Sequence, residues 1–208
     1  GQNRPRVDAR EKINGTARYL SDYDCGNCLH GFTVRSERAH ARISQIDFDP
    51  DFDWSLLTVV QAADIPGRNI NPVIFEDQPF LADQVVRFYG EPVLLLASPK
   101  LELCHEAARH ITIHYQELPT CFTIEESLAT DNPFFGSNNA FKELSINKGD
   151  VEAIFRREDL HFSEGEYRTG AQEQLYLEPQ AVLAKYDPDG LLVTGSLQCP
   201  FYVHSSLQ

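Results

Sequence analysis

The sequence predicts a protein of the α+β class, and three observations predict it. Short stretches in which apolar and polar residues alternate, typical of strands, recur through the first half of the 208-residue chain. A strand–helix–strand unit follows over residues 91–115. Near the end, over residues 174–198, two further strand patterns are joined by a tight turn.

The first half is expected to hold four strands. Residues 31–36 and 41–48 alternate apolar and polar side chains, and residues 56–62 form a short β-rich run that ends before the turn at Pro66. Residues 91–98 are apolar on both faces, which is typical of a central strand.

A helix is expected directly after the central strand, over residues 100–110. Ser98 is the predicted N-cap and Pro99 the predicted first helical residue. Apolar residues then recur at helical spacing, and the pattern changes to strand-like alternation over residues 110–115. The positions that define the helical face are Leu101, Cys104, Ala108 and Ile111.

Beyond residue 118 the composition changes. A short helix over residues 123–130 is predicted from the capping box of Thr123 and Glu126. Residues 131–150 are rich in Asn, Gly, Pro and Ser, and predict a long connection.

The last part of the chain predicts a helix and a hairpin. Asp150 is expected to cap a short helix over residues 151–157. Strands over residues 174–186 and 191–198 are joined at Asp-Pro-Asp-Gly, a strong hairpin signal, and the chain is expected to end in or just after the second of them.

Charge and composition exclude several functional classes. The formal net charge of −13 argues against a nucleic-acid or anionic-membrane partner, because both require a basic surface. No apolar run approaches the ~18 residues of a membrane span. The five cysteines are an odd number and favour a reducing compartment, so the cytoplasm is the expected location. Because the chain starts at Gly1 and has no Met, we expect it to be a piece of a longer protein.

Cys25 and Cys28 form a single CxxC motif that has two chemical interpretations. The motif can be half of a zinc site, which needs about two further ligands, or a redox pair, which usually opens a helix. No second motif follows at suitable spacing, and residues 29–31 lead into a strand. We therefore expect two turn cysteines without special chemistry.

A second group of metal-ligand residue types, made of Cys104, His105, His110 and His114, gives no site. His110 and His114 are expected on one strand, roughly 13 Å apart along it, which is too far for one ion. Cys104 is expected to pack in the core, as free cysteines commonly do. Motifs for nucleotide loops and nucleophilic serine are absent from the sequence.

Amides and carboxylates gather where the penultimate strand is predicted to begin. They are Gln172, Glu173, Gln174 and Glu178. A glutamine amide can donate a hydrogen bond to an oxygen ligand and can also accept one, but an ordinary solvated strand end explains the same residues.

Seven phrases, taken in order, resemble the molybdenum hydroxylase family of xanthine dehydrogenases and aldehyde oxidases. They cover about residues 6–201 and include "RVDAREKINGTARYLSDY", "LHGFTVRSERAHARISQIDFD", "DIPGRN", "DQPFLADQVVRFYGEPVLLLAS", "EAARHITIHYQELP", "INKGDVEAIF" and "GAQEQLYLEPQAVLAKYDPDGLLVTGSLQCPF". The order of the phrases is more specific than any single one.

The resemblance implies an architecture. Residues 1–120 would form a hammerhead-type α/β domain, and residues 121–208 the incomplete start of the first molybdopterin-binding α+β domain. The change in composition near residues 118–149 lies where this scheme places its boundary.

The resemblance also implies a chemistry. Family members use a molybdenum–pterin cofactor to insert oxygen from water into a C–H bond of a heterocycle or an aldehyde, and they pass electrons to 2Fe-2S clusters and FAD on partner domains or subunits. Gln172 matches the glutamine whose amide hydrogen-bonds an oxygen ligand of molybdenum. Glu173 and Glu178 are expected to make structural hydrogen bonds. The catalytic base would lie beyond residue 208, so the piece alone is expected to be inactive and to bind no cofactor.

Gln174 and residues 197–199 depart from the family pattern, which leaves the substrate unassigned. The complete protein is expected to form an oligomer. Two other hypotheses remain open at this stage: a non-catalytic module that docks partner subunits, and a small zinc or redox protein built on Cys25 and Cys28.

Overall fold

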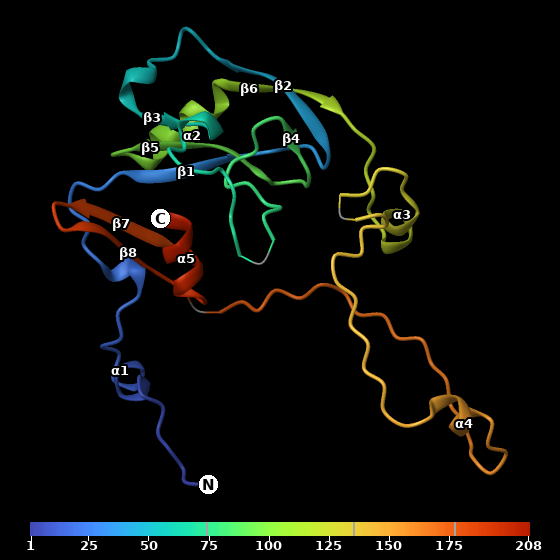
Figure 1. Ribbon diagram of the computed structural model, residues 1–208. Helices are drawn as coiled ribbons and strands as arrows, with labels where there is room; N and C mark the ends of the chain where they lie inside the picture. The colour runs from blue at the N-terminus through green and yellow to red at the C-terminus, as the bar shows by residue number, and fades with distance from the viewer. Residues whose placement is uncertain (74, 135, 177) are drawn as a thin grey trace. The chain divides into compact units, whose positions relative to one another are not determined.

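The structure is a computed structural model that describes residues 1–73, 75–134, 136–176 and 178–208. By its internal contacts the chain divides into two units. We call Gly1–Pro119 with Tyr176–Gln208 the first unit and Thr120–Leu175 the second unit. Each is described separately (Figure 1).

The first unit holds two three-stranded antiparallel sheets. One has the order β1-β5-β3 and contains β1 (His30–Arg35), β5 (Pro92–Ser98) and β3 (Thr58–Val60). The other has the order β4-β2-β6 and contains β4 (Val85–Val86), β2 (Ala41–Phe48) and β6 (Ile111–Glu117). The expected short strands and the central position of residues 91–98 are confirmed.

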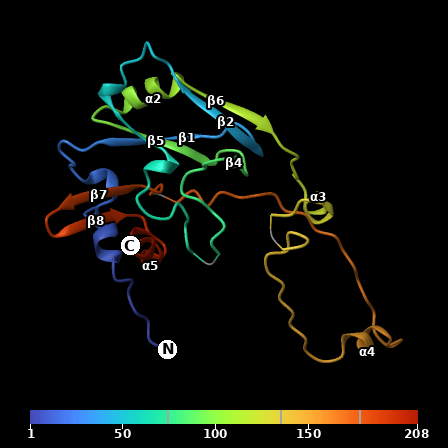
Figure 2. The ribbon, with the colours of Figure 1, turned by 45° about the horizontal axis from the view of Figure 1, so that its top comes forward.

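Helix α2 (Leu101–Arg109) connects β5 to β6, as predicted, and the two strands belong to different sheets. The helix contacts β1 and β5, and Figure 2 shows it beside them. Its N-cap is Lys100 rather than Ser98, and the Ser98 hydroxyl accepts a hydrogen bond from the Lys100 N–H at 3.3 Å. Pro99 restricts the residue before it to extended backbone, so β5 continues through Ser98 and the helix begins later than expected.

Two apolar clusters form the core of the first unit. Below α2, the buried residues are Leu94, Leu96, Cys104 and Ala107. Between β5 and the second sheet, they are Ala41, Ala82, Val86 and Val93. Strand β5 supplies both clusters because successive side chains of a strand point to opposite faces. Burial of two of its three leucines and of its valine is therefore what joins the two sheets.

Three short 3-10 helices complete this part of the chain. They are η1 (Leu20–Asp22), η2 (Trp54–Leu56) and η3 (Ala62–Asp64). A five-residue helix, α1 (Ala9–Ile13), precedes them.

After β6 the chain leaves the first unit beside His40. The ring Nδ1 of His40 lies 2.5 Å from the Pro119 carbonyl oxygen, and the His40 backbone carbonyl accepts the Leu118 N–H at 3.0 Å.

The predicted hairpin forms as β7 (Val182–Asp187) and β8 (Gly190–Gly195), with Asp187 opposite Gly190. The predicted strand over residues 174–186 is wrong in its first part, because residues 174–176 and 178–181 are not in a strand. Leu175 has a φ of +47°, which an extended strand does not tolerate, and the six residues of β8 pair only with residues 182–187. Leu177, within the predicted strand, lies outside the described residues.

A helix follows the hairpin, where the chain was expected to end in or after a strand. This helix is α5 (Pro200–Leu207), with Pro200 in its first turn. Proline is favoured there because its fixed φ suits the helix and its missing N–H has no intrahelical partner. Pro200 was the signal in the sequence that could have predicted α5.

The second unit contains two short helices, α3 (Ile124–Ala129) and α4 (Val151–Phe155). Both predicted caps are confirmed. Thr123 and Glu126 form the capping box of α3, and the Asp150 carboxylate accepts the Ala153 N–H at 2.9 Å. No described residue of this unit is buried.

Candidate functional site

The segment around Gln172 is an exposed, irregular stretch of the second unit. Residues 158–175 have no helix or strand, and Gln172 is exposed. A side chain added at Gly170 would meet no neighbouring atom, so the backbone beside Gln172 is open to approach. The Gln172 amide therefore offers a donor and an acceptor on an accessible surface.

Two carboxylates close to Gln172 in the sequence make the expected structural hydrogen bonds. Glu173 accepts the N–H of the next residue at 3.0 Å. Glu178, in the first unit, accepts the Leu20 N–H at 3.0 Å and so caps the first residue of η1. This bond between residues far apart in the sequence is partly buried, which strengthens it relative to a bond in water.

The structure gives different surroundings to the residues of the second group of metal-ligand types, Cys104, His105, His110 and His114. Cys104 is buried, and burial raises the pKa of its thiol. His105 packs its ring against Phe32, with 4.7 Å between ring centroids. His110 is the C-cap of α2 rather than a strand residue. Within the described ranges, no group of three or more His, Cys, Asp or Glu residues could hold a metal ion.

His110 and His114 each pair with an aspartate on or just after β2. His110 Nδ1 lies 2.8 Å from Asp49 Oδ2, and His114 Nε2 lies 2.8 Å from Asp47 Oδ2. The hydrogen bond from His114, and then that from Gln45, lowers the pKa of Asp47. The hydrogen bonds from His110 and from the Asp51 N–H lower the pKa of Asp49.

Sequence reasoning did not identify the two aspartates as partners of these histidines. The signal that could have found them is the alternation of Asp47 and Asp49 along the chain, together with the antiparallel pairing of β2 with β6. That pairing places Gln45 opposite His114 and Phe48 opposite Ile111.

Glu91 is a buried carboxylate that sequence reasoning also missed. Its oxygens accept the Arg87 backbone N–H and, at 3.1 Å, the Arg87 guanidinium. Only 1% of Glu91 is exposed. The pair closes the turn from β4 into β5, in which Gly90 has a φ of +88°. The sequence signal that could have identified Glu91 as a buried carboxylate is its position, as a charged residue, at the start of the otherwise apolar stretch over residues 91–98.

Cys25 and Cys28 lie in a bend between η1 and β1, as expected for turn cysteines. Both are half-buried free thiols. With no third ligand in the described part of the chain, the four-ligand zinc interpretation has no support from the geometry.

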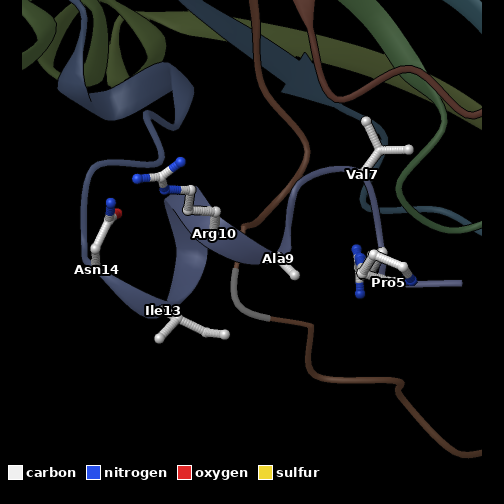
Figure 3. Close-up of a pocket in the computed structure, with 7 residues that line it drawn as sticks. Pro5, Val7, Ala9, Arg10, Ile13 and Asn14 are labelled. Carbon is white, nitrogen blue, oxygen red and sulfur yellow. The ribbon is translucent and has the colours of Figure 1, made fainter.

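The surface hollow drawn in Figure 3 lies around α1 and is lined by Pro5, Val7, Ala9, Arg10, Ile13 and Asn14, together with Arg6. Val7 and Ile13 are exposed and point away from one another. Ligand sites normally enclose most of the ligand surface, which this hollow cannot do.

The longest described helix, α2, has nine residues, and no described helix has the length and apolar character needed to cross a bilayer.

Known families match almost the whole chain. The domain described as "Aldehyde oxidase and xanthine dehydrogenase, a/b hammerhead domain" matches residues 14–119, and the "Molybdopterin cofactor-binding domain" matches residues 133–208. The first of these matches covers just over half of the chain.

Curated relatives carry consistent names. The nicotinate dehydrogenase large molybdopterin subunit of Eubacterium barkeri is 35% identical over 97% of this chain and 48% of its own length. The xanthine dehydrogenase of Blastobotrys adeninivorans is 31% identical over 91% of this chain and 13% of its own. The chain spans about half or less of the length of these relatives.

Solved structures support the fold. Quinoline 2-oxidoreductase from Pseudomonas putida 86 matches with a TM-score of 0.73 and 24% identity, over 97% of this chain and 27% of its own. Aldehyde oxidoreductase from Desulfovibrio gigas matches with a TM-score of 0.73 and 23% identity, over 92% of this chain and 23% of its own. The structure confirms the α+β class, and the two family matches confirm the expected order of a hammerhead domain and a molybdopterin-binding domain. The chain belongs to the aldehyde oxidase and xanthine dehydrogenase family of molybdenum hydroxylases.

Proposed function

We propose that the chain is part of the large, molybdenum-binding subunit of a xanthine dehydrogenase-like hydroxylase. The complete enzyme would insert oxygen from water into a C–H bond of a heterocycle or an aldehyde. The observation that carries this proposal is the succession of the two domain matches, hammerhead and then molybdopterin-binding, along one chain. A heterocyclic substrate is favoured because the names of relatives include nicotinate and xanthine dehydrogenases.

The proposed division lies near residue 120. Residues 1–120 would be the hammerhead domain and residues 121–208 the start of the first molybdopterin-binding domain. The hydrogen bonds of His40 to Leu118 and Pro119 support a boundary here, because they fix the backbone at the point where β6 has ended. The internal contacts divide the chain at the same point but group Tyr176–Gln208 with the first unit.

Gln172 is the residue proposed to face the cofactor. An amide N–H suits an oxygen ligand of a metal, and the exposed Gln172 side chain beside the open backbone of Gly170 leaves room for such a ligand. Gln172 offers this donor on an open surface without an enclosing cavity, so the chain would form one wall of a cofactor site. When bound, the molybdenum–pterin group would supply the oxygen-transfer and redox chemistry.

The contribution of this chain to the reaction would be orientation. The Gln172 amide would donate to an oxygen on the metal and so fix which side of the group faces the substrate. Glu178 would hold the chain six residues further on, through its bond to the Leu20 N–H. Neither residue is proposed as an acid, a base or a nucleophile.

The electrons released by the reaction would pass to 2Fe-2S clusters and FAD on partner domains or subunits. Two relatives support an enzyme assembled from several chains, because both are named as subunits. They are the large molybdopterin subunit of Eubacterium barkeri and a probable xanthine dehydrogenase subunit of Bacillus subtilis. A complete oligomer located in the cytoplasm is part of the same proposal.

The test is elemental analysis of the full-length gene product, purified with its natural partners. Near one molybdenum per chain is expected, and stoichiometric zinc without molybdenum would overturn the proposal. If the protein copurifies with iron–sulfur and flavin subunits but holds no molybdenum, the alternative of a non-catalytic docking module is favoured instead.

The role of Gln172 is tested by Gln172→Ala in the same full-length protein. Activity per bound molybdenum should fall roughly tenfold to hundredfold, because groups that orient metal ligands commonly contribute this much. Gln180→Ala is the matched control, since Gln180 is also an exposed glutamine outside helix and strand. Equal activity of the two variants would remove Gln172 from the site.

A further inference from the structure

The CxxC motif is a feature singled out by the sequence that the proposed function does not use. Cys25 and Cys28 lie in the first unit, in the bend between η1 and β1. Both thiols are free and half-buried, so they are partly accessible to a small molecule. Their chemistry does not depend on molybdenum.

The bend brings the two thiols together. Gly26 has a φ of +55°, a left-handed conformation that turns the chain back within the motif. The Asp24 carboxylate accepts the Gly26 N–H at 3.0 Å and fixes the start of the bend. The turn lies between Cys25 and Cys28, and the Cys28 thiol is near enough to contribute to the raised pKa of Cys25.

The surroundings favour exchange between thiol and disulfide over metal binding. A structural zinc site requires four ligands, and the described residues provide no group of three or more around any point. Two cysteines on either side of a tight turn, by contrast, can form an intramolecular disulfide without further residues.

We propose that Cys25 and Cys28 form a reversible disulfide by exchange with low-molecular-weight disulfides of the glutathione class. One thiolate attacks a sulfur of the small disulfide, which forms a mixed disulfide and releases one small thiol. The second thiolate then attacks the protein sulfur of that mixed disulfide and releases the other small thiol. The protein loses two thiol hydrogens, and the small disulfide is reduced to two thiols.

The remaining cysteines provide internal controls. Cys121 and Cys199 are exposed, and each lacks a cysteine within three residues in the sequence, so each can form a mixed disulfide without a neighbouring thiol to resolve it. Cys104 is buried against β1, with its Sγ 3.5 Å from the His30 carbonyl oxygen, and should not react in the folded protein.

The rate should increase as the pH rises. Burial, and next the Cys28 thiol, raise the pKa of Cys25. Because the thiolate is the attacking species, closure is expected to be slow at neutral pH and faster in alkaline buffer.

The experiment treats the full, reduced chain with glutathione disulfide in alkaline buffer, quenches with acid and maps each cysteine by mass spectrometry. The expected result is a Cys25–Cys28 disulfide together with lasting mixed disulfides at Cys121 and Cys199. The proposal is overturned if Cys25 or Cys28 keeps the small thiol, or if both stay reduced while the exposed cysteines react.

Two variants test the geometry. With Cys28→Ser, the mixed disulfide at Cys25 should persist because no second thiol displaces it. With Gly26→Val, closure should slow about tenfold, since a β-branched residue strongly disfavours a left-handed backbone. Gly67→Val is the control, because Gly67 has open space like Gly26 but no positive φ. Equal closure rates in the two valine variants would contradict the proposed geometry.

Discussion

The two units contain similar kinds of residues but use them differently. Strand β5 buries Val93, Leu94 and Leu96 almost completely, whereas no described residue of Thr120–Leu175 is buried. The second unit does not lack apolar side chains, since Phe122, Phe141 and Ile146 are all large, apolar and exposed. What it lacks is strand pairing in its described part, because both sheets and the hairpin lie in the first unit. Apolar content alone therefore does not form a core; extended elements that pair and stack are also required.

The largest expected effect is at the centre of the first unit. Leu94→Ala should lower the free energy of unfolding by about 2–5 kcal/mol, as expected for a truncated buried leucine. Leu95→Ala should cost less than half as much, because 38% of Leu95 is exposed. Ile146→Ala in the second unit should stay within about 0.5 kcal/mol of the unmodified protein.

Urea unfolding followed by fluorescence measures these changes. Trp54 is the single tryptophan and packs against Phe48 and Phe52, so it reports on the first unit. A Leu95→Ala effect equal to that of Leu94→Ala would contradict the assignment of the buried face of β5.

A smaller effect is expected at the buried carboxylate. Glu91→Ala removes the acceptor of the Arg87 backbone N–H and should destabilise the protein by about 1–3 kcal/mol. Glu76→Ala is the control, since Glu76 forms a comparable ion pair with Arg68 on the surface and should cost about 0–1 kcal/mol. The difference between their urea midpoints measures what burial and the backbone hydrogen bond together add to an ion pair, and equal midpoints would show that they add nothing here.

The third prediction concerns the second unit alone. Thr123→Ala removes the side chain that accepts the Glu126 N–H at 3.1 Å, and should weaken α3 by about 1 kcal/mol. Hydrogen exchange of amides in α3 should become faster, while the Trp54 unfolding transition stays in place. Thr123→Ser, which keeps the hydroxyl, should restore the exchange rates. A shift of the Trp54 transition would show that the two units unfold together.

The smallest effect depends on pH. His110 and His114 depress the pKa values of Asp49 and Asp47 below their ordinary value of 3.8. A lowered pKa in the folded state adds stability above the unfolded value, and this stability disappears as pH falls through the folded value. The stability difference between the native protein and an Asp47→Asn, Asp49→Asn variant should therefore shrink on acidification below about pH 4.

Thermal midpoints of the two proteins, followed through Trp54 in steps from neutral to acidic pH, check this prediction. Glu126→Gln provides the comparison in the second unit. The Phe122 N–H, and next the Thr123 N–H, lower the pKa of Glu126, yet this variant should leave the Trp54 midpoint unchanged at every pH. A constant difference between native protein and the double variant would contradict the role of the histidines.

Much of the first unit was predictable because its signals are local. The strands predicted at residues 31–36 and 41–48 follow from the alternation of apolar and polar side chains. In the second unit, the helix caps at Thr123 and Asp150 were predictable for the same reason, because a capping side chain stands at a fixed spacing from the N–H that it accepts. The start of α2 was predicted too early because Ser98 satisfies the rule for an N-cap but belongs to a strand that Pro99 keeps extended.

Other features depend on contacts between distant residues. The alternation from residue 174 resembles a strand, but no partner strand pairs with it before Val182 in the part of the chain that the structure describes. The burial of Glu91 and the pairing of Asp47 with His114 depend on which strands are neighbours, and the local pattern does not specify that. The role of Gln172 rests on a family resemblance, and nothing in its own exposed surroundings distinguishes it from Gln180.

The strand pairing has a consequence for how the protein folds during synthesis. Strand β1 pairs with β5 rather than with β2, and β2 pairs with β6, in which Ala41 lies opposite Glu117. Pairs so distant in sequence require large loops to close before their contacts form, which slows folding. Neither sheet can be completed until its last strand has left the ribosome. Until then the nascent chain exposes β1 without its partner, and β2 can pair only with the two residues of β4, which makes this interval the period of greatest risk for aggregation.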